Sequence, residues 1–288
     1  MVNIGLLANK TRHYSTRRLI EEGKTLNQNI ISIGTGNICL FVDNQLRYTI
    51  HRKKSPIDVI LPRFGDRHWN FFMTVLKHFE RTGIPCINTS ETIDICKNKY
   101  LTSLALKKKR VPQPKCALAF SEKDMLTYIK KMEKPLVLKL IDQSFGQGVS
   151  RINDDIEAED WLETVLSFKS PIYIQEYIPH PGEDYRILVI NHQVVGAMKR
   201  KAKPGEWKAN IALGGTPCPY RPTEEVKEIA IKSSEAVKAG VCGVDLMIHE
   251  GIPKVIEVNH NPQFKGLEQV SKNIAKEIMK YTVRKAKR

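Results

Sequence analysis

Two acidic side chains and an amide near the C-terminal end have the types and spacing of a divalent-cation site. Glu257 and Asn259 stand two apart in one apolar run, and a strand has a side-chain period of two, so both leave the same face of a sheet. An upstream apolar run that carries Asp245 predicts the partner strand. The turn residues Gly251-Ile252-Pro253 predict a three-residue loop that sets Asp245 opposite Asn259 on that face, whereas a two-residue loop would turn Asp245 away. Two carboxylates and an amide oxygen suit Mg²⁺, which keeps waters and binds substrate phosphates.

An isolated acidic pair on a strand is more often the solvated side of a hairpin, but other segments here could handle phosphate. Lys139 lies in an apolar run that leads into a loop with Gly146, Gln147 and Gly148. Glycines let backbone amides approach an anion closely, and a lysine supplies the point charge. The spacing matches neither a Walker loop nor a dinucleotide fingerprint, and a Gly-x-Gly alone is usually a hairpin turn.

A third segment has groups suited to a nucleoside. The strand that ends at Glu176-Tyr177 can pair with an adenine edge through main-chain hydrogen bonds, and Asp184 shortly after it can hold ribose hydroxyls. The alternative, an edge strand that runs into a turn at Pro179, fits this segment equally well.

A fourth segment suits a carboxylate that is becoming an acyl phosphate. Lys199-Arg200 supplies cations, Lys208-Ala209-Asn210 adds a cation and an amide, and Gly214-Gly215 forms a backbone turn. The alternative is a basic surface loop with a glycine turn, which is common.

Composition sets the class of protein. The 288 residues are 41% hydrophobic and 27% charged, which is typical of a globular chain of two or three lobes. No apolar stretch approaches a membrane span, and the six scattered cysteines fit reduced thiols, so we expect a cytoplasmic protein without membrane partners. The net charge of +15 is compatible with binding to nucleic acid, with binding to a polyanionic substrate, or with a solvated surface. No nucleic-acid-binding motif accompanies it, so no nucleic-acid partner is expected.

Strands and helices alternate along the chain, which predicts an α/β architecture. Strands are expected near 3–8, 30–33, 59–63 and 84–88, with helices at 15–23 and 69–81, as an open α/β sheet. A helix pair is expected over 89–109. A second α/β unit then has strands at 135–140, 172–175, 185–190 and 194–200, helices at 158–166 and 223–239, the metal hairpin, and a last helix over 270–287.

Taken together, these segments resemble the RimK-type branch of the ATP-grasp carboxylate–amine ligases. The resemblance covers nearly the whole chain and is most specific at 59–65, 175–178, 198–215 and 243–259. It implies an ATP-grasp fold: an N-terminal open α/β pre-ATP-grasp domain over residues 1–97, then an ATP-grasp domain over 98–288. Nucleotide would bind between two α+β lobes of that second domain, a central lobe (98–168) and a C-terminal lobe (169–288).

The resemblance also implies a role for each matching residue. ATP contacts would come from Lys99, Lys139, Gly146, Gln147, Gly148, Glu176, Tyr177, Asp184, Lys208, Ala209 and Asn210. Asp245, Glu257 and Asn259 would bind one or two Mg²⁺ ions, with Mn²⁺ as an alternative. Arg200 and Asn210 would be catalytic, and Arg186, Arg200, Gly214 and Gly215 would contact the substrate.

The implied reaction joins an amine to a carboxylate through an acyl phosphate, with L-glutamate added to a protein terminus or a glutamate-bearing coenzyme. The stretch from His260 to Glu268 departs from RimK itself and is more similar to LysX and ArgX relatives, which act on an amino-group carrier protein. A carrier-protein ligase that uses amino-adipate or glutamate is therefore the alternative. From another class, a basic nucleic-acid-binding protein with an inactive nucleotide fold would leave the metal ligands without a role. Family members often form dimers or tetramers, and the sequence does not fix the oligomeric state.

Overall fold

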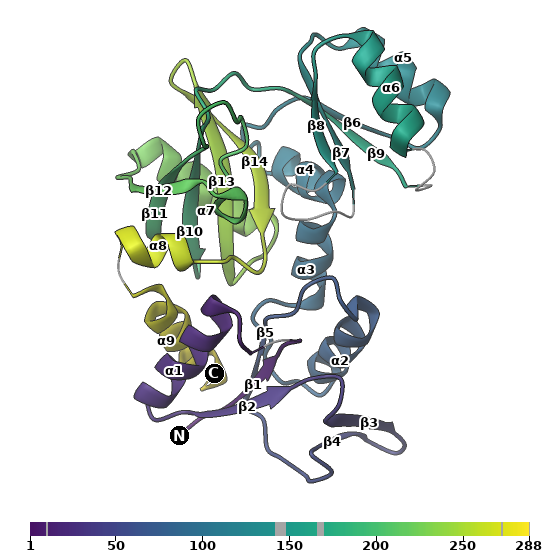
Figure 1. The fold of residues 1–288 in the computed structure, drawn as a ribbon. Coiled ribbons are helices and arrows are strands. Elements are labelled where there is room, and N and C mark those ends of the chain that lie inside the picture. Colours follow the sequence, from purple (N-terminus) through teal and green to yellow (C-terminus); the bar gives the residue numbers. More distant parts are fainter. Residues whose placement is uncertain (10, 142–147, 166–169, 272, 288) are drawn as a thin grey trace.

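The computed structural model describes residues 1–9, 11–141, 148–165, 170–271 and 273–287. Within these residues the chain forms an N-terminal domain, a central lobe and a C-terminal lobe (Figure 1). In that view the N-terminal domain is at the bottom, with the C-terminal lobe above it and the central lobe at the upper right.

The N-terminal domain is built on a parallel sheet of order β2-β1-β5. Its elements are β1 (Asn3–Leu7), α1 (Tyr14–Thr25), β2 (Asn29–Ile33), β3 (Ile38–Val42), β4 (Leu46–Ile50), β5 (Val59–Pro62) and α2 (Trp69–Arg81). β1 and β5 are almost wholly buried, as expected for parallel strands covered on both faces. The β3–β4 hairpin was not predicted. The strand predicted at 84–88 was wrong, because that segment makes only an isolated bridge between Cys86 and Ile60.

Two short helices, α3 (Ser90–Lys97) and α4 (Lys99–Lys108), lead out of this domain and confirm the predicted helix pair. Asn98 separates them, and its Oδ1 accepts hydrogen bonds from the backbone N–H groups of Tyr100 (3.0 Å) and Leu101 (3.1 Å). A side chain that caps two free N–H groups fixes where a helix begins. Lys99 is therefore held in the first turn of α4.

The central lobe is an antiparallel sheet of order β6-β9-β7-β8. Its elements are β6 (Cys116–Ala119), α5 (Glu122–Lys131), β7 (Leu136–Leu140), β8 (Val149–Ile152), α6 (Asp155–Val165) and β9 (Ile172–Glu176). Helices α5 and α6 pack on one face and bury a core that includes Ile129, Leu138 and Leu162. β6, α5 and β8 had not been predicted.

The C-terminal lobe is an antiparallel sheet of order β12-β11-β10-β13-β14. Its elements are β10 (Glu183–Ile190), β11 (Gln193–Lys201), the short 3-10 helix η2 (Ile211–Leu213), β12 (Thr216–Pro219), α7 (Glu224–Ala236), β13 (Val241–His249), β14 (Ile252–Asn259), α8 (Lys265–Val270) and α9 (Ile274–Ala286). Helix α7 covers one face, where Ile187, Val244 and Val258 belong to the same core as its Ile229. The intervening residues of these strands face the other way.

The β13–β14 hairpin differs from the prediction in its turn and its register. Glu250 and Gly251 form a two-residue turn with positive φ at both positions, and Asp245 lies opposite Glu257, not Asn259. A two-residue turn alone would pair Asp245 with Ile256 and direct it away from Glu257. The register shift between Asp245 and Leu246 leaves Ile256 as the extra residue of a bulge, and this restores the shared face.

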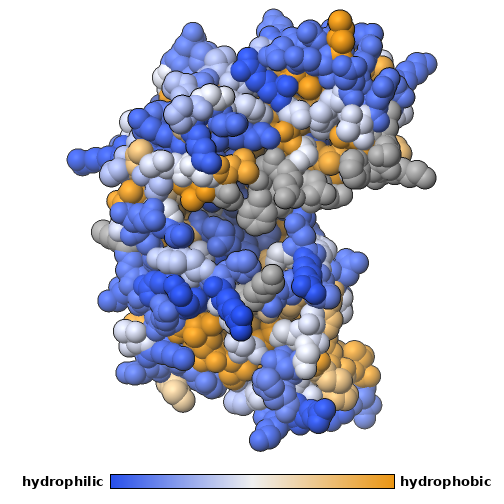
Figure 2. Space-filling model, viewed as in Figure 1, coloured by the Kyte–Doolittle hydropathy of each residue, from blue (hydrophilic) through white to orange (hydrophobic). Residues whose placement is uncertain are grey.

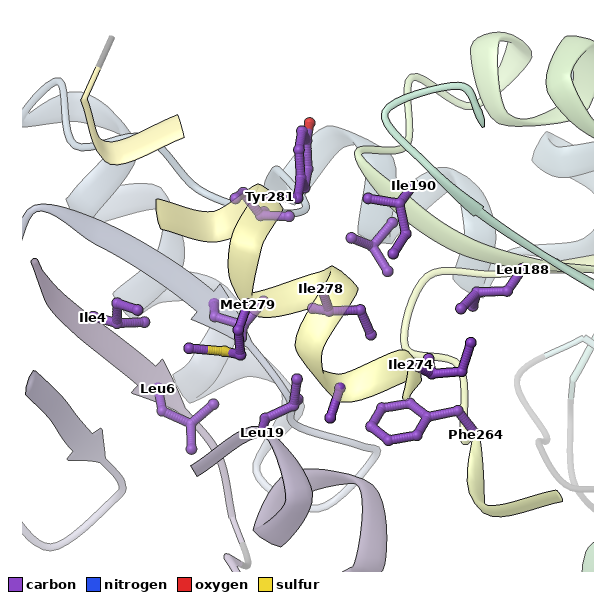
Figure 3. Packing of buried hydrophobic residues seen from close by; sticks show 14 of the residues in the cluster. Ile4, Leu6, Leu19, Leu188, Ile190, Phe264, Ile274, Ile278, Met279 and Tyr281 are labelled. Carbon is purple, nitrogen blue, oxygen red and sulfur yellow. The ribbon is translucent and has the colours of Figure 1, made fainter. Parts of the chain in front are cut away.

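Helix α9 packs the C-terminal lobe against the N-terminal domain. Figure 3 shows it between Ile4 and Leu6 of β1 on one side and Leu188 and Ile190 of β10 on the other. A hydrogen bond also joins the two parts: the Phe264 N–H donates to Ser15 Oγ (3.1 Å). This domain and this lobe therefore share one core, on which the site is assembled.

All six cysteines are free. Among the described residues, none of the helices has both the length and the apolar character needed to cross a membrane.

Candidate active site

The face of the C-terminal sheet opposite α7 carries a row of charged side chains. Strand alternation and the register of β10 to β14 direct Arg186, Arg200, Asp245 and Glu257 to one side, the side opposite α7. Asp184 and Asn259 lie on the same face, two residues along their strands from Arg186 and Glu257. Such residues belong to a binding site, to a buried ion-pair network or to both, and the ion pairs are described first.

Two arginines bind the aspartates of this row through paired hydrogen bonds. Arg186 donates from Nε and Nη2 to the two oxygens of Asp245, both at 2.6 Å. Arg200 donates in the same manner to Asp184, at 2.5 and 2.7 Å, and its Nη2 also lies 3.1 Å from Asp245 Oδ2. The Arg200 side chain is only 3% exposed, so its charge depends on these carboxylates for compensation.

Asp245 remains an ionised group in this setting. Burial alone would raise its pKa, but the guanidinium charges of Arg186 and Arg200 outweigh burial and hold the pKa of Asp245 below its ordinary value. Asn259 donates from Nδ2 to Asp245 Oδ2 at 3.3 Å. Glu257 differs from both: its half-buried carboxylate has no ion pair or hydrogen bond among the described residues.

These three side chains fit a hard divalent cation. Among the described residues, no group of three His, Cys, Asp or Glu side chains forms a cage for a metal. Two carboxylates and one amide oxygen, once the Asn259 amide is turned, leave half of the positions of an octahedral ion to water and phosphate, which is how Mg²⁺ binds with nucleotides. Glu257, which has no ion pair or hydrogen bond among the described residues, is the candidate ligand most ready to receive it.

The central lobe contributes a buried lysine. Lys139 on β7 donates from Nζ to Gln175 Oε1 at 2.6 Å and lies over the ring of Tyr173. Burial lowers the pKa of Lys139 to about 8. No carboxylate neutralises it by direct contact among the described residues, so it is ready for an anionic ligand.

Two further lysines connect the lobes. Lys99, at the start of α4, donates to the backbone oxygens of Leu140 (3.3 Å) and Ile141 (3.2 Å) at the end of β7. Lys208, in the loop after β11, donates to the Val149 oxygen at 2.7 Å. Both bring positive charge to the space between the two sheets.

A cavity of about 110 Å³ lies between the central and C-terminal lobes. It is lined by residues of both sheets, among them the predicted Lys99, Lys139, Glu176, Tyr177, Asp184, Arg200, Lys208, Ala209, Asn210, Asp245 and Glu257. Figure 2 shows a recess at mid-height on this side of the molecule, bordered largely by hydrophilic residues.

A second cavity of about 200 Å³ lies between the C-terminal lobe and the N-terminal domain. It shares Lys99, Arg200, Asn210 and Glu257 with the first, so the two cavities meet at these residues. Its other charged lining residues are Asp66, Lys97, Arg186 and Lys265. Five cations line it together with Asp66 and Glu257, and three of them are in ion pairs: Lys97 with Asp66, and Arg186 and Arg200 with Asp245.

One wall of the second cavity is aromatic. The Trp69 ring packs edge-on against His260, with centroids 6.3 Å apart. Burial, with Arg63 and Lys97 nearby, lowers the pKa of His260 to about 3, so the imidazole is neutral. The wall therefore adds neutral rings to a cavity that arginines also line.

Not every predicted site residue is found in the lining of these cavities. Gly146 and Gln147 fall outside the described residues, and Gly148 lines neither cavity. Gly214 and Gly215 also line neither; the Gly215 N–H donates to the Asn210 oxygen at 3.1 Å. A Cβ on Gly215 would lie 2.3 Å from the Ala209 oxygen, so this glycine shapes the loop that presents Ala209 and Asn210.

Other lining residues were missed from the sequence. They include Gln175, His180 and Trp207 in the first cavity, and Trp69, Lys97, Asn261 and Lys265 in the second. Gln175 follows from strand alternation, since it lies two residues after Tyr173 beside Lys139. The others stand in turns or at helix ends, where no periodicity marks a residue as facing a site.

The fold and the cation-lined cavity between two lobes define a class, the ATP-grasp ligases. The ATP-grasp ligase PsnB in complex with a minimal precursor is similar with a TM-score of 0.78 and 14% identity, covering 99% of this chain and 100% of that one. The D-alanine–D-alanine ligase of Bacillus anthracis in complex with ATP gives a TM-score of 0.71 at 18% identity, covering 99% and 97%. At these identities the likeness is one of fold.

Sequence comparisons define the family. Residues 2–93 match the RimK PreATP-grasp domain, and residues 96–282 match the RimK-like ATP-grasp domain. The probable alpha-L-glutamate ligase of Chromohalobacter salexigens is 33% identical over 291 residues, covering 99% of this chain and 96% of the relative. That of Stutzerimonas stutzeri is 31% identical over 286 residues, covering 97% and 95%. The chain belongs to the RimK family of ATP-grasp ligases.

The enzyme is therefore an ATP-dependent carboxylate–amine ligase. Ligases of this fold use ATP with Mg²⁺, and PsnB has also been solved with Mg and ADP. The predicted class, fold and reaction type are confirmed.

Proposed function

We propose that the enzyme adds L-glutamate to a carboxylate acceptor, either a protein C-terminus or a glutamate-bearing coenzyme, through an acyl phosphate. One observation carries the proposal: the two cavities meet at Lys99, Arg200, Asn210 and Glu257. A nucleotide in the first cavity and an acceptor in the second would bring the γ-phosphate and the reacting carboxylate together there. The relatives named probable alpha-L-glutamate ligases support glutamate as the amino acid.

In this proposal the first cavity holds ATP with its base at the end of β9. The Ile178 N–H has no acceptor among the described residues and is available to an adenine nitrogen. Glu176 and Tyr177 line the same end, and Lys139 and Lys99 neutralise the phosphates. Lys208, Ala209 and Asn210 approach the phosphates from the C-terminal lobe. The prediction that Asp184 holds the ribose stays a prediction, since both its oxygens accept bonds from Arg200.

The chain's own residues would act mainly by positioning and by charge. Arg200, fixed by Asp184, would steady the acceptor carboxylate while one of its oxygens attacks the γ-phosphorus and ADP leaves. The α-amine of the added amino acid then attacks the carbonyl carbon of the acyl phosphate and loses a proton. Phosphate departs with the oxygen that came from the acceptor carboxylate. Asn210 is suited to donate to the oxyanion of that tetrahedral intermediate. Asp245, Glu257 and Asn259 would hold one or two Mg²⁺ ions, or Mn²⁺ in its place, which supply charge neutralisation at the phosphates.

The charge of the second cavity supports an acidic acceptor and an acidic amino acid. Its lining has five cations, and three of them, Lys97, Arg186 and Lys265, are not shared with the nucleotide cavity. We also propose domain boundaries after residues 97 and 168. The family matches over 2–93 and 96–282 support the first boundary. The second boundary lies outside the described residues.

One specific feature favours a second candidate. His260 lines the acceptor cavity, and with Asn259, Phe264 and Lys265 it makes this segment similar to ligases that act on an amino-group carrier protein. The second candidate is therefore a ligase that joins glutamate or amino-adipate to such a carrier.

A coupled assay of ADP release separates these candidates. Each amino acid is offered with a glutamate-terminated peptide, a glutamate-bearing coenzyme, or an amino-group carrier protein. ADP release that requires L-glutamate with the peptide or coenzyme supports the first proposal, and release only with the carrier supports the second. Absence of ADP release under every combination would contradict both.

A further inference from the structure

His180 is a lining residue of the nucleotide cavity to which no role has been given so far. It lies in the turn between β9 and β10, and its ring centroid is 5.6 Å from that of Tyr177. Trp207 lines the same end of the cavity, 6.2 Å from the Tyr177 ring. The imidazole is therefore part of the wall beside the expected seat of the base.

The turn fixes which nitrogen of this imidazole carries the hydrogen. The Gly182 N–H donates to His180 Nδ1 at 3.1 Å, so Nδ1 is the acceptor and Nε2 is the N–H donor of the neutral ring. Gly182 has φ +72, a backbone conformation that glycine adopts without strain, so the bond is built into the turn. Burial, helped by Arg151, lowers the pKa of His180, and the ring is neutral near pH 7.

The Nε2–H group lacks an acceptor. Nε2 is buried, and no hydrogen-bond partner for it exists among the described residues. A buried donor without an acceptor destabilises a protein, so such a group in the wall of a cavity indicates a ligand oxygen or nitrogen that completes it. The nearby cation Arg151 stacks on Tyr177, with its Cζ 4.5 Å from the ring centroid, and offers no acceptor.

The position of the turn identifies the part of the nucleotide it would meet. Along the chain, His180 stands between the Ile178 N–H, available to the base, and Asp184, which Arg200 links to Asp245 of the proposed metal site beside the phosphates. The sugar lies between base and phosphates in any adenine nucleotide. We infer that His180 Nε2–H donates to a ribose hydroxyl oxygen and so selects ribonucleotides over deoxyribonucleotides, an inference that rests on the proposed seat of the nucleotide.

Binding of three nucleotides tests this inference without requiring turnover. The affinities of ATP, 2′-dATP and 3′-dATP are measured by calorimetry, with Mg²⁺ and no other substrate, for the wild type, His180→Phe and His180→Gln. We expect the wild type to prefer ATP over one deoxy analogue by about three- to tenfold, the worth of one neutral hydrogen bond. His180→Phe should lower the affinity for ATP by that factor and leave the affinity for this analogue unchanged. His180→Gln, which keeps a donor, should restore part of the preference for ATP.

Other outcomes would overturn the inference. A preference that persists in His180→Phe, an equal loss for all three nucleotides, or no preference in the wild type would each show that the ring does not contact the ribose hydroxyls. Thermal unfolding of both variants shows whether the turn survives the substitutions. Absence of any nucleotide binding by the folded wild type would instead contradict the proposed function, so the two failures are distinguishable.

Discussion

Arg186 and Asp245 face each other across β10 and β13, and the guanidinium donates to both carboxylate oxygens at 2.6 Å. Arg200 adds a third contact to the same carboxylate at 3.1 Å. Asp245 is therefore both a metal-ligand candidate and the counter-charge of two guanidiniums, one of them almost fully buried.

Replacing Asp245 with Ala should destabilise the fold as well as the site. The substitution leaves two guanidiniums without this carboxylate, and breaking a buried pair from one side costs about 3–5 kcal/mol. Urea denaturation measures the loss, and the double variant Asp245→Ala with Arg186→Met should recover part of it. An unchanged urea midpoint for Asp245→Ala would contradict this account of the charged row.

Glu257→Gln should have the opposite profile, with normal stability and lost activity. Glu257 has no ion pair or hydrogen bond among the described residues and acts on the Lys139 charge only from a distance, so its charge contributes little to folding. Its loss at the metal should lower turnover by about 100-fold or more, since a metal's charge stabilisation is worth several kcal/mol. The matched control is Glu250→Gln in the exposed turn of the same hairpin, which should turn over normally. Near-normal turnover by Glu257→Gln would count against the site.

Lys139→Met should weaken ATP binding while stabilising the free protein near pH 7. Removing a charged donor to the phosphates should lower the affinity for ATP by roughly 10- to 100-fold. Removing a buried charge should raise the free energy of unfolding by roughly 1–3 kcal/mol, reduced by the lost bond to Gln175. Calorimetry and urea denaturation measure the two effects, and a variant that binds ATP as tightly as the wild type would exclude Lys139 from the phosphate site.

The stability effect of Lys139 has a definite sign in pH. Burial lowers the pKa of Lys139 to about 8 from its ordinary 10.5, so between these values the unfolded chain binds the extra proton. The penalty is fully present below about pH 8 and disappears as the pH rises toward 10.5. The stability advantage of Lys139→Met over the wild type should therefore shrink across that window. An advantage that is constant from pH 7 to 10 would refute the buried charge as its cause.

Lys265→Glu should separate the two cavities kinetically. Lys265 is exposed, lines the acceptor cavity and does not line the nucleotide cavity. Charge reversal there should raise KM for the acidic acceptor or for glutamate by about tenfold and leave KM for ATP unchanged. Lys232→Glu on α7, in an exposed ion pair with Glu228, is the charge-matched control. Equal effects of the two variants would show that only the overall charge matters.

The parts of the site that lie in regular helices and strands could be predicted from the periodicity of the sequence. Two-residue alternation was enough to place Glu257 and Asn259 on one face, and the asparagine before Lys99 is a recognisable helix start. The side on which Asp245 falls depended on a two-residue turn and a bulge at Ile256, whose offsets cancel. Pattern alone does not reveal a bulge, because it is set by packing of both faces.

Residues outside regular elements were not predictable in the same way. His180 acquires its significance from the Gly182 N–H that fixes its tautomer and from the cavity it lines, and both depend on how two lobes meet. Lys97 and Lys265 belong to different domains but line the same cavity, because α9 packs the C-terminal lobe against the N-terminal domain. Long-range placement of this kind follows from the tertiary core, not from local spacing.

The most direct test of the central claim follows oxygen from the acceptor to the released phosphate. The acceptor identified by ADP release is labelled with ¹⁸O in its carboxylate, and the phosphate formed during ligation is examined by mass spectrometry. If the γ-phosphate and the carboxylate meet where the two cavities join, each phosphate should carry one ¹⁸O from the acceptor. Phosphate free of label, with the ¹⁸O lost from the acceptor carboxylate recovered in water or another product, would contradict the account.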